Sequence, residues 1–133
     1  MSLKEINQSP EFALSQKKIN GMILLHFENE RPLQGALGDL DWRLNGHFSR
    51  LMREQILTGK EGEVIYAPVL WNHLTFHFVV IGGGSRNPDE KRPQLSRSLT
   101  EAALKKIHEL KLTQMGVSAN DGMVEDPEVW ILN

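Results

Sequence analysis

Hydrophobic and polar residues follow two different periods along the chain, and these periods predict strands interspersed with helices. Residues 19–27, INGMILLHF, form an aliphatic segment that is too short for an average helix and predicts a buried strand. Further strands are predicted at 64–70 and 74–81, and the short connection 71–73 predicts a hairpin. In the second of these strands, alternation predicts one buried face at first and two buried faces over the last four residues.

Two other segments carry apolar residues at every third or fourth position, which is the spacing of one helix face. The first stripe covers residues 37–56, with Asp39 as the expected N-cap. Asn45-Gly46 falls inside it and predicts a kink or a split in the helix. The second stripe predicts a helix over residues 94–111.

Shorter segments complete the pattern. Two glycines within four residues predict a turn at 58–63, residues 115–119 predict a short strand, and residues 129–132 predict a terminal strand. Strands that alternate with helices predict an α/β domain with a mixed sheet. The length of 133 residues is that of one domain, so residues 1–133 are expected to form a single unit.

Composition narrows the class of protein. Apolar residues make up 40% of the chain and the net charge is −2, which is a globular composition without the basicity expected of a nucleic-acid-binding protein. The absence of cysteine excludes disulfides and thiol chemistry and fits a reducing cytoplasm. Residues 1–12 lack the apolar run of a signal peptide, and the longest apolar runs are too short to span a bilayer. We therefore expect a cytoplasmic protein that binds neither nucleic acid nor membrane.

The glycine run Gly82-Gly83-Gly84-Ser85 is the first candidate site, because it directly follows a predicted buried strand, where α/β folds bind ligands. Backbone amides without side chains can wrap a phosphate. The run matches neither of the common phosphate-binding glycine motifs, and the next helix begins about ten residues later. A small-molecule site and a plain strand-to-helix connection are both open interpretations.

The spacing of the remaining polar residues predicts no metal, no cofactor and no catalytic residue. His73 and His77 lie four apart on a predicted strand, which separates them by roughly 13 Å and prevents them from sharing one ion. No G-x-S-x-G motif surrounds any serine, and Ser96 or Ser98 is expected to cap the helix that begins there. Basic residues between 86 and 106 alternate with acidic ones, which predicts a solvated surface of mixed charge.

The three tryptophans are candidates for a protein interface. Trp42 lies in an early helical turn, Trp71 at the predicted hairpin and Trp130 in the terminal segment, where exposure is possible. Exposed aromatic side chains are common anchors of protein interfaces. Packing in the core is the alternative for each of them.

Three segments taken in order resemble the N-terminal domain of the leucine aminopeptidases: LDWRLNGHFSRLMREQILTGKEGEVIYAP, FHFVVIGGG and SLTEAALKKIHELKLTQMGVS. The matching positions are Leu40-Asp41, Gly46, Gly59-Lys60, Gly62-Glu63, Val80-Ile81-Gly82 and Ala102-Ala103. The resemblance covers about residues 19–119. It implies a three-layer, macro-domain-like α/β fold, with a mixed β-sheet flanked by helices.

In that family the N-terminal domain is not the catalyst. A separate domain holds two metal ions around an N-T-D-A-E-G-R signature, which does not occur in this sequence. The resemblance therefore implies a non-catalytic interaction, regulatory or oligomerisation module that binds a protein partner or itself. Two alternatives are open: a binder of a nucleotide or ADP-ribose-like molecule through residues 82–85, and a fragment of a full metal-dependent aminopeptidase.

Overall fold

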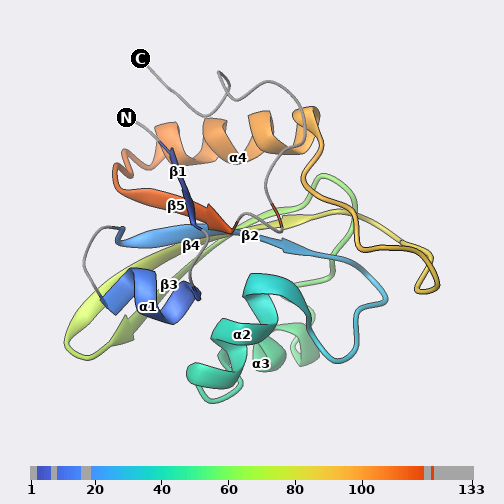
Figure 1. Ribbon diagram of the computed structural model, residues 1–133, viewed down its shortest axis with the longest axis horizontal. Helices are drawn as coiled ribbons and strands as arrows, with labels where there is room; N and C mark the ends of the chain where they lie inside the picture. Colours follow the sequence, from blue (N-terminus) through green and yellow to red (C-terminus); the bar gives the residue numbers. More distant parts are fainter. Residues whose placement is uncertain (1–2, 7–8, 16–18, 119–120, 122–133) are drawn as a thin grey trace.

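The computed structural model describes residues 3–6, 9–15, 19–118 and 121, which form one sheet between two layers of helices (Figure 1). The expected three-layer α/β architecture is confirmed. The elements are β1 (Leu3–Ile6), α1 (Pro10–Ser15), β2 (Gly21–His26), α2 (Gly35–Arg43), α3 (His47–Arg53), β3 (Val64–Trp71), β4 (Leu74–Gly82), α4 (Arg97–Glu109) and β5 (Met115–Ser118).

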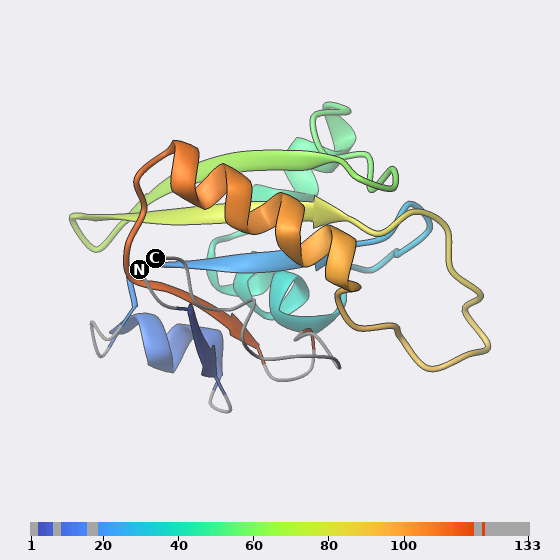
Figure 2. The same ribbon diagram turned by 90° about the horizontal axis from the view of Figure 1, so that it is seen from above.

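The strands lie in the order β1-β5-β2-β4-β3, and only β3 runs antiparallel to its neighbour. The chain therefore passes from β4 through α4 to β5 by crossing β2, and Figure 2 shows α4 lying across the sheet. Because β2, β4 and β5 are parallel, their carboxyl ends meet at one edge of the sheet. The loops that follow these three strands are thus brought together although they are far apart in sequence.

Each face of the sheet has its own apolar core, supplied by alternate residues of the central strands. Met22 and Leu24 of β2 pack on the side of α2 and α3, whereas Ile23 and Leu25 pack on the side of α4. In β4 Phe76 is buried between the exposed Thr75 and the half-buried His77, and the residues from 78 to 81 are all buried, although Leu74 at the start of the strand is 43% exposed. The predicted change from one buried face to two is therefore confirmed. The tight turn between β3 and β4 consists of only two residues, Asn72 and His73, both with positive φ.

The predicted split in the first helical stripe is confirmed, but the predicted N-cap is wrong. Helix α2 ends at Arg43 and α3 begins at His47, and Gly46 between them has a φ of 78°. Helix α2 begins at Gly35, so Asp39 lies within it instead of preceding it. The amide of Ala36, in the first turn, instead stabilises the carboxylate of Asp121. A side chain from the far end of the chain serves where a local cap was expected.

A second carboxylate of α2, Asp41, caps the start of α3. Its Oδ1 accepts from the backbone N–H of Ser49 at 2.8 Å, and its Oδ2 accepts from the hydroxyl of the same serine at 2.5 Å. Asp41 thus satisfies a donor in the first turn of α3 from the last turn of α2.

We expect Asp41→Ala to lower the free energy of unfolding by about 0.5–2 kcal/mol, the usual cost of losing a helix cap. Urea unfolding followed by circular dichroism measures it. Asp39→Ala is the matched control, because no hydrogen bond of Asp39 to a described residue is present, and it should change stability by less than about 0.5 kcal/mol. Equal losses in the two variants would contradict the capping role.

Two N-terminal elements were not predicted. Strand β1 pairs with β5 at the edge of the sheet, and α1 follows it. Ser9 Oγ accepts from the backbone N–H of Phe12 at 3.3 Å and Pro10 occupies the first helical position, so a start signal was present in the sequence. At α4 the expected cap is confirmed, since Ser96 accepts from the N–H of Leu99. The strand predicted at 129–132 lies outside the described residues.

Candidate functional site

The glycine run lies where β4 ends, and the amides of its three glycines are already occupied. Gly82 N–H donates to Glu63 O at 2.7 Å, Gly83 N–H to His26 O at 2.8 Å and Gly84 N–H to Gly59 O at 2.8 Å. The hydroxyl of Ser85 donates to Glu28 Oε2. A phosphate bound here would have to displace bonds that join the loop to two other segments, the turn at 58–63 and the end of β2.

Close packing accounts for two of these glycines. A Cβ on Gly82 would lie 2.0 Å from the carbonyl oxygen of Lys60, and one on Gly83 would lie 2.4 Å from the ring of Phe27. Neither position has space for a side chain, whether or not a ligand binds. The loop therefore holds the end of β4 against the turn at 58–63 and against the end of β2.

A buried cluster of charged side chains lies at the same edge of the sheet. Arg92 donates to Glu30 through Nε at 2.6 Å and Nη2 at 3.1 Å, to the carbonyl of Leu25 at 2.5 Å, and to Asp121. Arg86 adds a second ion pair to Glu30 at 3.3 Å. Glu30 and Asp121 are 2% and 0% exposed. The cluster connects the segments that follow β2, β4 and β5.

This cluster corrects the prediction that the basic residues after 86 form a solvated surface. The side chains of Arg86 and Arg92 are only 10% and 15% exposed, and both guanidinium groups lie over the ring of Phe27. Sequence reasoning missed the cluster because each member stands in a polar loop that is unremarkable by itself. The available signal was that each of them follows a predicted strand, and parallel strands bring their carboxyl ends to one edge of a sheet.

Burial and pairing act against each other on these charges. Burial lowers the pKa of Arg92, but Glu30 and Asp121 together raise it by more than burial lowers it. The pKa is therefore above its ordinary value and the guanidinium stays charged. Burial raises the pKa of Asp121, although Arg92 and the N–H of Ala36 oppose the change. Asp121 Oδ2 has no hydrogen-bond partner among the described residues. The arrangement is therefore sensitive to the loss of any one member.

His26 is the buried end of β2 and borders the same edge. Burial lowers the pKa of His26 from its ordinary 6.5, while Glu30 and Glu63 act in the opposite direction and Arg92 and Arg31 act with burial. Glu63 is affected by burial, which raises its pKa, but hydrogen bonds from Thr58 and Gly59 outweigh this and lower it. Both groups therefore bind a proton more weakly in the folded protein than in the unfolded chain.

It follows that the free energy of unfolding should fall as the pH decreases below 6.5, first through His26 and, at lower pH, through Glu63. Urea unfolding at about pH 7.5 and about pH 5.5 measures the difference. His26→Gln should reduce it, with part remaining because burial also lowers the pKa of His47. His108→Gln, on the exposed face of α4, should leave it as in the wild type. An unchanged difference in His26→Gln would rule out this contribution.

Of the three interface candidates, Trp42 is the exposed one that the structure describes. Its side chain is 75% exposed, and Arg43 lies over its ring at 4.8 Å. Trp71 is half-buried and packs against Phe76, which agrees with the core alternative for that residue. Trp130 lies outside the described residues.

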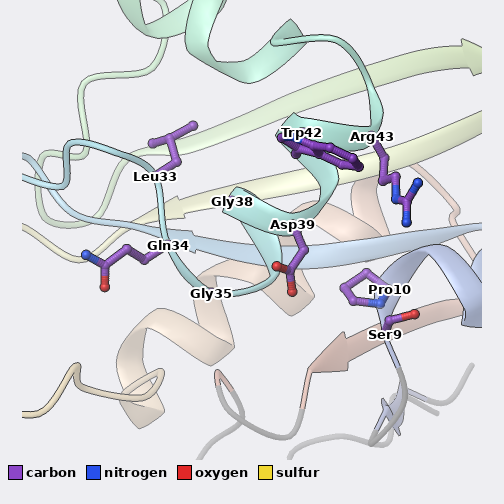
Figure 3. A pocket seen from close by; sticks show the side chains of 9 residues that line it. All are labelled: Ser9, Pro10, Leu33, Gln34, Gly35, Gly38, Asp39, Trp42 and Arg43. Carbon is purple, nitrogen blue, oxygen red and sulfur yellow. The ribbon is translucent and has the colours of Figure 1, made fainter.

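Trp42 lies between two open hollows on the face of the sheet that α1, α2 and α3 cover. Figure 3 shows the first, of about 520 Å³, where Ser9 and Pro10, at the start of α1, face Asp39 and Trp42 of α2. The second has a volume of about 420 Å³ and lies between Trp42, α3 and the segment that follows β2. Gly38 borders both hollows, and a side chain at that position would clash with the carbonyl of Leu33.

The remaining candidates take structural positions. His77 forms a 2.7 Å hydrogen bond with the hydroxyl of Tyr66 and stacks on its ring, while His73 is a turn residue. Within the described residues no group of three or more His, Asp or Glu side chains is arranged to hold a metal ion. The helices of the described part are also too short or too polar to cross a bilayer.

Comparison with known proteins relates the chain to one class of enzyme. No family model matches. The chain is 27% identical over 106 residues to a probable cytosol aminopeptidase of Persephonella marina, and 28% identical over 116 residues to a probable cytosol aminopeptidase of a Sulfurihydrogenibium species. These matches cover 80% and 87% of this chain but 21% and 22% of the relatives, so the chain spans about a fifth of their length. The similarity supports the expected relationship to the cytosol aminopeptidases.

Proposed function

We propose that this chain is a non-catalytic interaction module, related to the N-terminal domain of the leucine aminopeptidases, that binds a protein partner or a second copy of itself. The observation that carries this proposal is Trp42, a large aromatic side chain that is 75% exposed between two hollows. Burying such a side chain at an interface releases much more apolar surface from water than burying the polar residues around it. A cytoplasmic location is part of the proposal and agrees with the names of the relatives.

The small-molecule alternative has less support. It depends on free amides in the run 82–85, and the N–H groups of Gly82, Gly83 and Gly84 each donate to a backbone carbonyl. A thermal-shift comparison with nucleotides tests it directly, because a ligand that binds the folded state at a concentration about 100-fold above its Kd adds about 2.7 kcal/mol of stability.

The aminopeptidase alternative applies to a longer protein of which this chain would be one part. In that case the surface around Trp42 would face the remainder of that protein or another subunit, so the interaction role is shared by both interpretations. Hydrolysis of leucine amide by the purified chain with added manganese or zinc would contradict the non-catalytic proposal.

Sedimentation velocity over a wide concentration range tests self-association, and affinity capture from a native lysate tests partner binding. Trp42→Ala should weaken the association that is observed, by about tenfold or more if Trp42 is an anchor. Leu70→Ala is the matched control, because Leu70 is 74% exposed but lies on the hairpin arm away from α2. A monomer at every concentration, together with identical captured proteins for the wild type and Trp42→Ala, would refute the proposal.

A further inference from the structure

We infer that the partner is an acidic peptide segment with a large apolar side chain, and that it binds in the second hollow, between Trp42, α3 and the segment after β2. This inference rests on the proposed function and specifies its partner. Three features of the hollow support it. Its rim carries positive charge that is not paired within the described residues, apolar surface is exposed beside that charge, and the carboxylate of Asp41 is hydrogen-bonded to Ser49 and not to the arginines.

The positive charge comes from two exposed residues that line the hollow, Arg31 in the segment after β2 and Arg53 at the end of α3. Neither guanidinium forms an ion pair or hydrogen bond with another described residue. They differ in this from Arg86 and Arg92, which are buried and paired with Glu30. Two exposed guanidinium groups are available to form charge-assisted hydrogen bonds with carboxylates of a partner.

The carboxylate that borders the hollow, Asp41, forms no ion pair with either arginine among the described residues, so two positive charges and one negative charge line the hollow. Both oxygens of Asp41 accept hydrogen bonds from Ser49, one from its backbone N–H and one from its hydroxyl. The hydrogen bonds of Asp41 thus join α2 to α3, whereas the arginine side chains are exposed to solvent. An anionic partner is therefore favoured at the rim over a cationic one.

The apolar part of the hollow determines what else the partner must carry. Trp42 is 75% exposed, and Leu33 and Met52 are half-buried beside it. An aromatic ring and a flexible methionine form a surface that accepts a leucine or aromatic side chain. A hollow of about 420 Å³ accommodates a few side chains of an extended segment. Negative charge together with one apolar anchor describes an acidic peptide better than a nucleic acid, particularly in a chain of net charge −2.

Fluorescence anisotropy with two labelled probes tests this inference on the full chain. The first probe is a peptide of about ten residues with several glutamates around a central leucine, and the second is its twin with glutamine at every glutamate position. The glutamate peptide should bind about tenfold more tightly than its twin at low salt and should weaken as salt is added. Arg31→Gln and Arg53→Gln should each reduce its affinity about two- to fivefold. Trp42→Ala should reduce it about tenfold or more.

Two controls separate this effect from general changes in charge or fold. Arg97→Gln removes one positive charge on α4, at the other face of the sheet, and should bind the peptide as the wild type does. Leu70→Ala removes an exposed apolar side chain elsewhere and should do the same. Circular dichroism and urea unfolding confirm that each variant is folded before its affinity is compared.

Equal affinity for the two peptides, or an unchanged affinity in Arg31→Gln and Arg53→Gln, would overturn the inference. Tighter binding of a labelled single-stranded oligonucleotide than of the glutamate peptide would also overturn it and would assign the basic rim to nucleic acid. If neither peptide binds but the chain self-associates through Trp42, the proposed function stands and the acidic partner is rejected. If neither peptide binds and Trp42→Ala changes no association, both are rejected.

Discussion

Replacing Arg92 with alanine is expected to lower the free energy of unfolding by about 3–5 kcal/mol, the cost of breaking a buried ion pair on one side. The substitution would leave two carboxylates, Glu30 and Asp121, in sites where they are 2% and 0% exposed. It would also free the carbonyl of Leu25, which accepts from Arg92. Urea unfolding measures the loss, and a rise in amide exchange in the segments after β2 and β4 should accompany it.

A matched pair of variants shows whether the loss comes from buried charge. Arg97→Ala removes an arginine whose partner, Glu101, is exposed, and should cost less than about 0.5 kcal/mol. Glu30→Gln introduced into Arg92→Ala should recover part of the stability, because it removes one of the unpaired charges. If Arg92→Ala and Arg97→Ala were equally stable, the cluster would not hold the loops together as inferred.

A loss of about 3–5 kcal/mol is also expected for Phe48→Ala, the usual range for deleting a fully buried phenylalanine side chain. Phe48 is 0% exposed and meets Phe78 of β4 edge to face, with 5.5 Å between the ring centroids. It is the buried residue by which α3 is attached to the sheet. Its loss should therefore loosen α3 together with the second hollow that α3 helps to form.

Phe12→Ala is the control for this variant, because Phe12 is 46% exposed on α1 and should cost less than about 1 kcal/mol. Phe48→Ala should also weaken binding of the glutamate peptide, whereas Phe12→Ala should not. A stability change of less than about 1 kcal/mol in Phe48→Ala would show that α3 is held by other contacts.

The pattern of apolar residues predicted most elements of the sheet and both long helical segments. Strands β2, β3, β4 and β5 and helix α4 lie within a few residues of their predicted bounds. Periodicity succeeds for these elements because each has a face that must be buried. Strand β1 and helix α1 were missed because the N-terminal residues carry charges and contain no apolar run that would mark elements of four and six residues.

The candidate sites were less accessible from sequence. The glycine run was recognised, but sequence alone could not show that its amides donate to Glu63, His26 and Gly59, which lie 19 or more positions earlier in the chain. Exposure and core packing were both open for Trp42 and Trp71, and the structure shows Trp42 exposed and Trp71 half-buried. Burial of a tryptophan depends on which helix or strand packs against it, and local sequence does not carry that information.

Local sequence therefore specifies the elements of this protein, because the interactions that form helices, strands and turns join residues a few positions apart. The charged cluster was decided by the fold. Glu30, Arg92 and Asp121 are separated by 62 and 29 positions, and they meet because parallel strands direct their carboxyl ends to the same edge. The hollow beside Trp42 has the same origin, since its walls come from α2, α3 and the segment after β2. The charged cluster and the hollow both depend on how the helices and strands pack together. The pattern of apolar residues that predicts each helix or strand gives no information about that packing.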